Sequence, residues 1–161
     1  MANIVNDKVV ITIDAFLGTK DKTLTVRDVR DILQASHSTA YNILTQLNRF
    51  NIVERIKKGK SHAYELLNSP QTKALARLIN ERKRISKNVD KSPINDRDIV
   101  VILYNNRKMI VGPVEHTGSE ENKGISEETF VENISKKPEV IPKMIVLSNF
   151  DKFYNLIWQT K

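Results

Sequence analysis

The stretch "SHSTAYNILTQLNRF", residues 36–50, combines a helical hydrophobic repeat with an outward face of unusual composition. Its apolar residues recur three and four positions apart, as they do along the buried stripe of an amphipathic helix. The members of this predicted stripe are Ala40, Ile43, Leu44, Leu47 and Phe50. We therefore expect a helix here, with Ser36 as its N-cap.

The opposite face of this helix consists mainly of neutral hydrogen-bonding residues. Exposed helix faces usually carry Glu and Lys, whereas Ser, Thr and Asn are mediocre helix formers because their side chains compete for backbone hydrogen bonds. No Asp or Glu occurs between Asp31 and Glu54. The outward positions and their neighbours are Ser38, Thr39, Tyr41, Asn42, Thr45, Gln46 and Arg49. Helix stability does not explain the neutral polar composition of this face, which therefore indicates a function.

Two helices are predicted before this stretch and a hairpin and a helix after it. Residues 4–17 show helical spacing, and Thr25 has capping-box spacing to Asp28 at the start of a short second helix. That helix is expected to bury Val26, Val29, Ile32 and Leu33. Two β-type runs, 52–57 and 62–67, follow and are joined through Gly59. A longer helix should then cover residues 70–86, with Leu75, Leu78, Ile79 and Ile85 on one side.

This order of elements resembles the winged helix–turn–helix domain of MarR- and ArsR-like transcription regulators, over residues 4–85. Three segments carry the resemblance: "TVRDVRDIL" as the supporting helix, "SHSTAYNILTQLNRFNIVER" as the recognition helix and first wing strand, and "KKGKSHAYEL" as the wing. The family usually has Gly just before the first wing strand, where this chain has Asn51. Asn tolerates the left-handed conformation better than most residues, so the same turn is expected.

The rest of the chain predicts a small α/β domain after a polar linker. Residues 99–104 form a continuous apolar run, as a strand buried on both faces does, and Asn105-Asn106 should turn the chain into a hairpin partner. A polar loop at 115–124 should follow, and then a helix capped by Ser126. After a turn between Pro138 and Pro142, we expect a strand at 143–147 and a last helix with a Ser148–Asp151 capping box. The expected fold class is α+β, with a winged helix–turn–helix at 1–86, a linker at 87–97 and a β-β-α-β-α domain at 98–161.

The outward face of residues 36–50 matches the chemistry of the DNA major groove. Ser, Thr, Asn and Gln both donate and accept hydrogen bonds and so suit base edges, while carboxylates would repel phosphates. The expected base-reading residues are Ser38, Thr39, Asn42, Thr45 and Gln46. The expected phosphate and wing contacts are Ser36, His37, Tyr41, Arg49, Arg55, Lys57, Lys58 and Lys60. A solvated polar surface and a winged helix that binds protein remain the alternatives.

The charge distribution favours a polyanionic partner for the first half alone. The net charge is +7, with 18 Lys/Arg and 10 Asp/Glu in residues 1–97 and 8 and 9 in residues 98–161. The resemblance implies double-stranded DNA as partner and a homodimer on pseudopalindromic sites, with the helix at 70–86 as dimerisation helix. The second domain is expected to dimerise, sense a small molecule or bind a protein effector.

No catalytic set, cofactor site or metal site is predicted. The chain has no cysteine, and its three histidines lack metal-ligand spacing. Asp98, Glu115 and Glu120–Glu121 could be imagined as a nuclease site, but strand-end and loop charges are the simpler interpretation. No membrane span or secretory signal is expected, and a cytoplasmic, nucleoid-associated regulator is the favoured prediction. A plasmid or viral replication or partition protein and a protein–protein adaptor are the alternatives.

Overall fold

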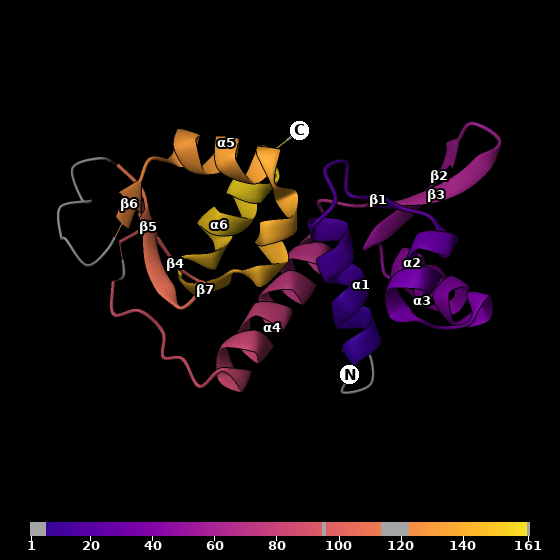
Figure 1. Cartoon of the computed structure of the whole chain (residues 1–161), viewed down its shortest axis with the longest axis horizontal. Helices are drawn as coiled ribbons and strands as arrows, with labels where there is room; N and C mark the ends of the chain where they lie inside the picture. The colour runs from indigo at the N-terminus through magenta and orange to yellow at the C-terminus, as the bar shows by residue number, and fades with distance from the viewer. Residues whose placement is uncertain (1–5, 95, 114–122, 161) are drawn as a thin grey trace. The chain divides into compact units, whose positions relative to one another are not determined.

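The computed structural model describes residues 6–94, 96–113 and 123–160. It has the α+β composition expected, with helices and two small sheets that belong to two compact units, Met1–Ile79 and Asn80–Lys161 (Figure 1). The division falls inside a helix, ahead of the expected linker at 87–97, whose described residues contain no helix or strand. Among the described residues no helix is long and apolar enough to cross a membrane.

The first unit contains the predicted helices and hairpin, with boundaries close to those expected. Its elements are α1 (Asp7–Leu17), β1 (Thr23–Leu24), α2 (Val26–Leu33), α3 (His37–Arg49), β2 (Val53–Lys58), β3 (Ser61–Leu66) and the start of α4 (Pro70–Ser86). The two-residue strand β1 was not predicted. It pairs with β3 in a sheet of order β1-β3-β2, and it is too short to leave an alternating pattern in the sequence.

Side-chain caps fix where α2 and α3 begin. The Thr25 hydroxyl accepts from the Asp28 amide while the Asp28 carboxylate accepts from the Thr25 amide, so the predicted capping box is confirmed. α2 ends at Gln34, which has the left-handed φ of 48°. Ser36 then caps α3 by accepting from the Thr39 amide. The chain therefore leaves one helix and enters the next within three residues.

The predicted buried stripe of α3 is confirmed except at its last position. Ala40, Ile43, Leu44 and Leu47 are buried, whereas Phe50 is 48% exposed. α3 ends at Arg49, and Asn51 takes a left-handed φ of 60°, so Phe50 no longer follows the helical repeat. The left-handed turn expected at Asn51 is thus present.

The expectation for α2 was too broad. Only Val29 is fully buried, Val26 and Leu33 are half-buried, and Ile32 is 44% exposed. A helix of eight residues offers little more than two turns, and only one of its rows faces the core.

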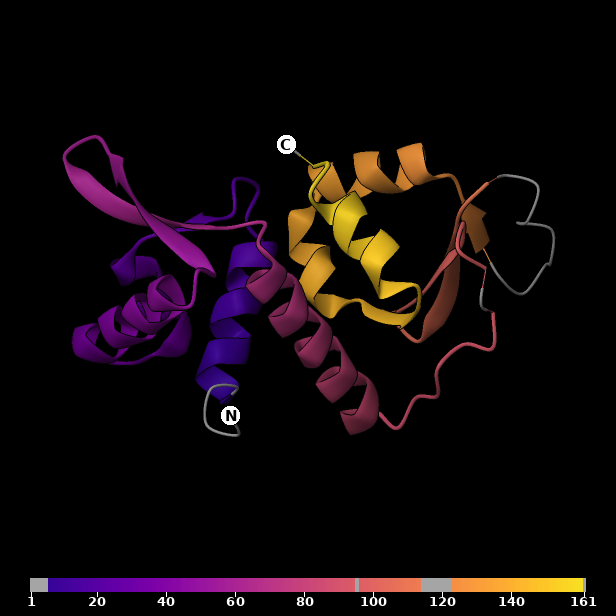
Figure 2. The ribbon, with the colours of Figure 1, turned by 180° about the vertical axis from the view of Figure 1, so that it is seen from behind.

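The β2–β3 hairpin has the predicted position and turn. Gly59 has a φ of 65°, as the first position of a two-residue hairpin turn demands, and a Cβ there would meet open space. Figures 1 and 2 show the tip of this hairpin extending beyond the helices of the first unit.

The single apolar side predicted for α4 is wrong in part. Leu75 and Ile79 are buried, but Leu78 is 53% and Ile85 67% exposed. The buried row instead contains Thr72, Leu75, Ala76, Ile79 and Asn80, which has the spacing of a core-facing helix row.

The second unit is a four-stranded sheet of order β6-β5-β4-β7 with helices packed on it. β4 (Val100–Tyr104) and β5 (Arg107–Val111) form the predicted hairpin, whose turn residues Asn105 and Asn106 have φ values of 50° and 59°. β7 (Ile145–Ser148) pairs antiparallel with β4, and β6 (Lys123–Ile125) pairs parallel with β5. β6 was not predicted because it lies in the expected polar loop, of which residues 115–122 are outside the described residues.

Three helical segments complete the second unit: α5 (Glu127–Lys136), the 3-10 helix η2 (Pro138–Lys143) and α6 (Phe150–Ile157). Ser126 caps α5 as predicted. The predicted capping box at Ser148 is wrong, because the Ser148 hydroxyl accepts from the Val101 amide across the sheet and α6 starts after Asn149, with a φ of 53°. α6 packs against β4, β7 and α5.

The buried side chain of Asn80 acts as a strand partner for β7. β7 is an edge strand, and Asn80 both donates to the Val146 carbonyl (3.0 Å) and accepts from the Val146 amide (2.7 Å). The amide therefore satisfies two backbone groups that a sheet edge would otherwise leave without partners.

We predict that Asn80→Ala lowers the free energy of unfolding by about 2–3 kcal/mol, because it leaves a buried amide and carbonyl unsatisfied. Urea denaturation of the full chain measures this. Gln71→Ala, at an exposed position of the same helix, is the control and should change stability by less than about 0.5 kcal/mol. Equal effects of the two substitutions would contradict the role of Asn80.

Candidate nucleic-acid interface

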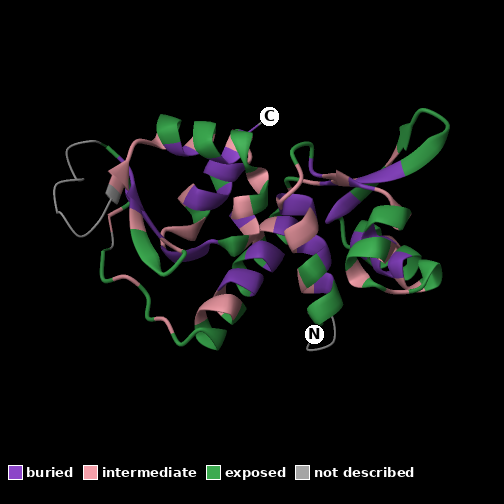
Figure 3. Ribbon diagram, in the orientation of Figure 1, coloured by how far each residue is buried: buried purple, intermediate pink, exposed green. Residues whose placement is uncertain are grey.

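The outward stripe of α3 is accessible in the first unit. Ser38, Asn42, Gln46 and Arg49 are exposed, and Thr45 is half-buried. Figure 3 shows exposed positions along α3 and over the outer part of the hairpin. Because residues 38, 42, 45 and 49 are spaced by four, three and four, they form one continuous row opposite the buried stripe.

Two of the predicted contacts are engaged in the cap of α3. The Ser36 hydroxyl, besides accepting from the Thr39 amide, lies 2.9 Å from the Thr39 hydroxyl. Thr39 is half-buried. Ser36 and Thr39 thus stabilise the start of the helix. The outward row described above begins after the cap, at Ser38.

Aromatic side chains flank this row. Tyr41 is 43% exposed at the edge of the row, and Phe50 is exposed at the C-terminal end of α3. Sequence reasoning missed Phe50 because the helical repeat placed it in the core. The signal that could have found it is Asn51, since a left-handed residue ends the repeat one position earlier.

The strand register divides the hairpin cations between two faces. Residues directly opposite each other in antiparallel strands share a face, and faces alternate along each strand. Arg55 pairs with Tyr64 and Lys57 with His62, so Arg55, Lys57 and His62 share one face, which we call the Arg55–Lys57 face. Lys58 pairs with Ser61 on the other face.

The face that carries Lys58 is also acidic. The Lys58 ammonium lies 3.2 Å from the Asp21 carboxylate, and Glu54 stands opposite Glu65 in the same register. The Arg55–Lys57 face holds no carboxylate among its paired positions. The sequence analysis listed Lys57 and Lys58 together as wing contacts. The strand register shows that they lie on opposite faces of the hairpin.

The remaining predicted contacts are exposed near these groups. His37 opens α3 at its first helical position, Arg49 closes it, and Lys60 occupies the hairpin turn beside Gly59. In the described parts of the first unit, no ion pair involves Arg49, Arg55, Lys57 or Lys60. Neutral hydrogen-bonding groups on a helix, with cations at its end and on one hairpin face, can contact base edges and phosphates respectively.

Of the residues considered for a nuclease site, only Asp98 lies within the described residues. Glu115, Glu120 and Glu121 lie outside the described residues, and the Asp98 carbonyl accepts from the Lys152 ammonium (2.9 Å). Within residues 6–94, 96–113 and 123–160 no three His, Asp or Glu residues are grouped so that they could hold a metal ion.

Comparisons with known protein families, curated proteins and solved structures find no match to this chain.

We predict that Ser36→Ala destabilises the protein by about 1 kcal/mol, because the Thr39 amide loses its N-cap partner. Thermal unfolding of the full chain measures the change. Ser38→Ala is the matched control: it removes a hydroxyl from an exposed helical position and should leave stability unchanged or slightly higher. A larger loss in Ser38→Ala than in Ser36→Ala would contradict the assignment of the cap.

Proposed function

We propose that the chain is a sequence-specific double-stranded DNA-binding protein, a transcription regulator built on a winged helix–turn–helix domain in its first unit. The observation that carries the proposal is the accessible neutral row on α3, Ser38, Asn42 and Thr45, bounded by Arg49 and the hairpin cations. A helix of this kind fits the major groove, where each base pair presents a distinct set of donors and acceptors.

The division of roles follows from the chemistry of each group. Asn42 and Gln46 suit adenine, to which a side-chain amide makes two hydrogen bonds, while Ser38 and Thr45 bond either base type. Arg49 and the Arg55–Lys57 face supply cations for phosphates, which fix the position of the protein without reading sequence.

The first test compares two asparagines of α3. We expect Asn42→Ala to lower the preference for the cognate site over random DNA by about 1–3 kcal/mol, with nonspecific binding retained. Asn48→Ala is the control, since Asn48 is exposed on the same helix but lies about 120° away around its axis. Fluorescence anisotropy with cognate and random duplexes measures both. Equal losses in the two variants, or equal losses on both duplexes, would contradict base reading by Asn42.

The second test compares neighbouring lysines on opposite faces of the hairpin. Lys57→Ala should weaken binding to all sequences alike and reduce the slope of log K against log salt by about one unit. Lys58→Ala should change this slope less, because Lys58 already lies beside Asp21. Titrations at several salt concentrations give the slopes, and the reverse order would assign the phosphate contact to the other face.

We further propose that the protein binds DNA as a homodimer through α4. Leu78 and Ile85 are exposed and seven residues apart on this helix, so they lie on one face, as in a helix–helix seam. Leu78→Lys should shift the protein toward the monomer in light scattering at tens of micromolar. Ser86→Lys is the control, because it adds the same charge at an exposed position about 100° around the helix axis from Ile85. A monodisperse monomer for the unmodified chain would contradict the dimer.

Two alternative functions predict different results. A replication or partition protein would bind tandem repeats, and a protein–protein adaptor would show no salt-sensitive DNA binding.

A further inference from the structure

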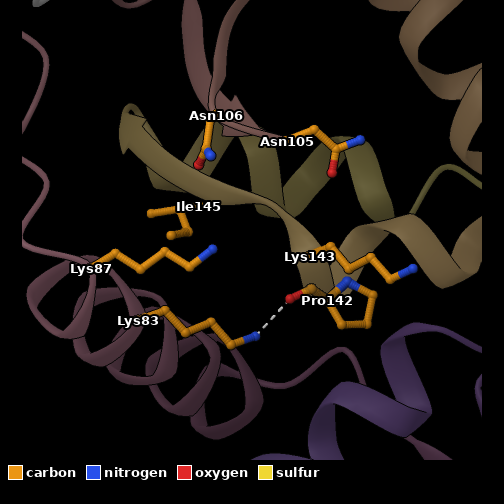
Figure 4. Close-up of a pocket in the computed structure, with 7 residues that line it drawn as sticks. All are labelled: Lys83, Lys87, Asn105, Asn106, Pro142, Lys143 and Ile145. Carbon is orange, nitrogen blue, oxygen red and sulfur yellow. Dashed lines mark hydrogen bonds between the residues drawn. The ribbon is translucent and has the colours of Figure 1, made fainter.

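The second unit contains a concave cavity that the DNA-binding proposal does not use. Its volume is about 490 Å³, within the range typical of small-molecule sites. Three segments of the unit meet around it: the C-terminal part of α4, the turn between β4 and β5, and the end of η2 leading into β7 (Figure 4).

Positive charge is concentrated at this cavity. Lys83, Lys87 and Lys143 line it, and no Asp or Glu is among its lining residues. Residues 80–161 carry 14 Lys/Arg and 12 Asp/Glu, so the excess is local to the cavity and not a property of the whole unit. Like charges gathered in a concavity repel one another, and a bound anion would relieve that repulsion.

The arrangement of the lysines favours an anionic ligand inside the cavity. Lys83 lies in the last turn of α4, and Lys87 follows the end of the helix at Ser86. The Lys87 amide donates to the Lys83 carbonyl (3.1 Å), so the two residues are one turn apart, and Figure 4 shows both side chains extending toward the cavity. Lys83 is held there by donating to the Pro142 carbonyl (2.9 Å). Lys143 lies on the opposite side of the cavity, and Figure 4 shows its ammonium directed away from Lys83 and Lys87.

The frame around the lysines is fixed by the backbone. Asn105 and Asn106 lie in a tight turn in which both residues have left-handed φ values. In Figure 4 the Asn106 amide is directed toward the side of the cavity that Ile145 lines, and Asn105 lies beside it at the edge. The hydrogen bonds between Asn80 and Val146 tie α4 to β7, one residue beyond the cavity wall at Ile145. The backbone around the lysines is therefore held in place before a ligand binds.

From these observations we infer that the cavity binds the phosphate groups of a small phosphorylated molecule, with Lys83 and Lys87 as the phosphate ligands. Asn105 and Asn106 would hydrogen-bond its polar groups, and Ile145 and Pro142 would contact its apolar part. A lone phosphate would fill only a fraction of the volume, so the ligand class is a nucleotide-sized phosphate ester. A nucleic-acid strand is disfavoured because the lysines surround a concavity and do not follow an extended track.

The test is a direct binding measurement on the full chain by isothermal titration calorimetry, with ADP, pyrophosphate and adenosine as probes. We expect ADP and pyrophosphate to bind and adenosine to bind at least tenfold more weakly. Lys87→Ala should weaken ADP binding about tenfold or more, as loss of a charge-assisted hydrogen bond does, and Lys87→Arg should retain it.

Lys137→Ala is the matched control, because it removes the same charge from an exposed site of the same unit outside the cavity. It should leave ADP binding within about twofold of the unmodified chain, and thermal unfolding verifies that all variants fold. No binding of ADP or pyrophosphate at millimolar concentration, equal effects of Lys87→Ala and Lys137→Ala, or equal binding of adenosine and ADP would each overturn the inference. So would a loss of random-duplex binding in Lys87→Ala as large as its loss of ADP binding, since that would make the cavity part of a DNA-binding surface.

Discussion

The burial of one stripe of α3 is the constraint on which the rest of the first unit depends. Ala40, Ile43, Leu44 and Leu47 are each almost completely removed from solvent. A rotation of the helix by one residue, about 100°, would move this stripe out of the core. The core therefore fixes which residues of α3 face outward, and the Ser36 cap fixes where the helix begins.

The hairpin adds a second constraint, this time on charge. Its register separates Arg55 and Lys57 from Lys58, so that the cations free of acidic neighbours share one face and the Asp21 ion pair lies on the other. Under the proposed function, α3 would supply hydrogen-bonding specificity and this face a nonspecific attraction that weakens with salt. The two properties should therefore respond to different substitutions.

Much of the fold could be predicted from local patterns. The caps at Thr25, Ser36 and Ser126 are confirmed, as are the hairpin turns at Gly59 and Asn105–Asn106, because each depends on residues only a few positions apart. The predictions were wrong where contacts between segments that are not neighbours in the sequence determine the structure. Ser148 bonds across the sheet to Val101 instead of capping α6, and β6 joins the sheet by parallel pairing with β5, which no local pattern in the sequence indicates.

The same distinction applies to the candidate sites. The polar row of α3 could be predicted because helical periodicity alone brings its residues together. The opposite faces of Lys57 and Lys58 required the strand register, and the lysine cavity required the approach of α4 to the β4–β5 turn and η2. In the sequence, Lys83 and Lys87 belong to the basic run "RLINERKRISK", which has no sign of a concave site.

The most direct measurement of the proposed function is selection of bound duplexes from a randomised DNA pool by the full chain at fixed, near-physiological salt. If the row of α3 reads base edges, successive rounds should converge on one sequence motif, repeated with inverted symmetry when the protein is dimeric. A pool that stays random while DNA is still retained would show that the protein holds only the phosphate backbone. That result would contradict our assignment of α3.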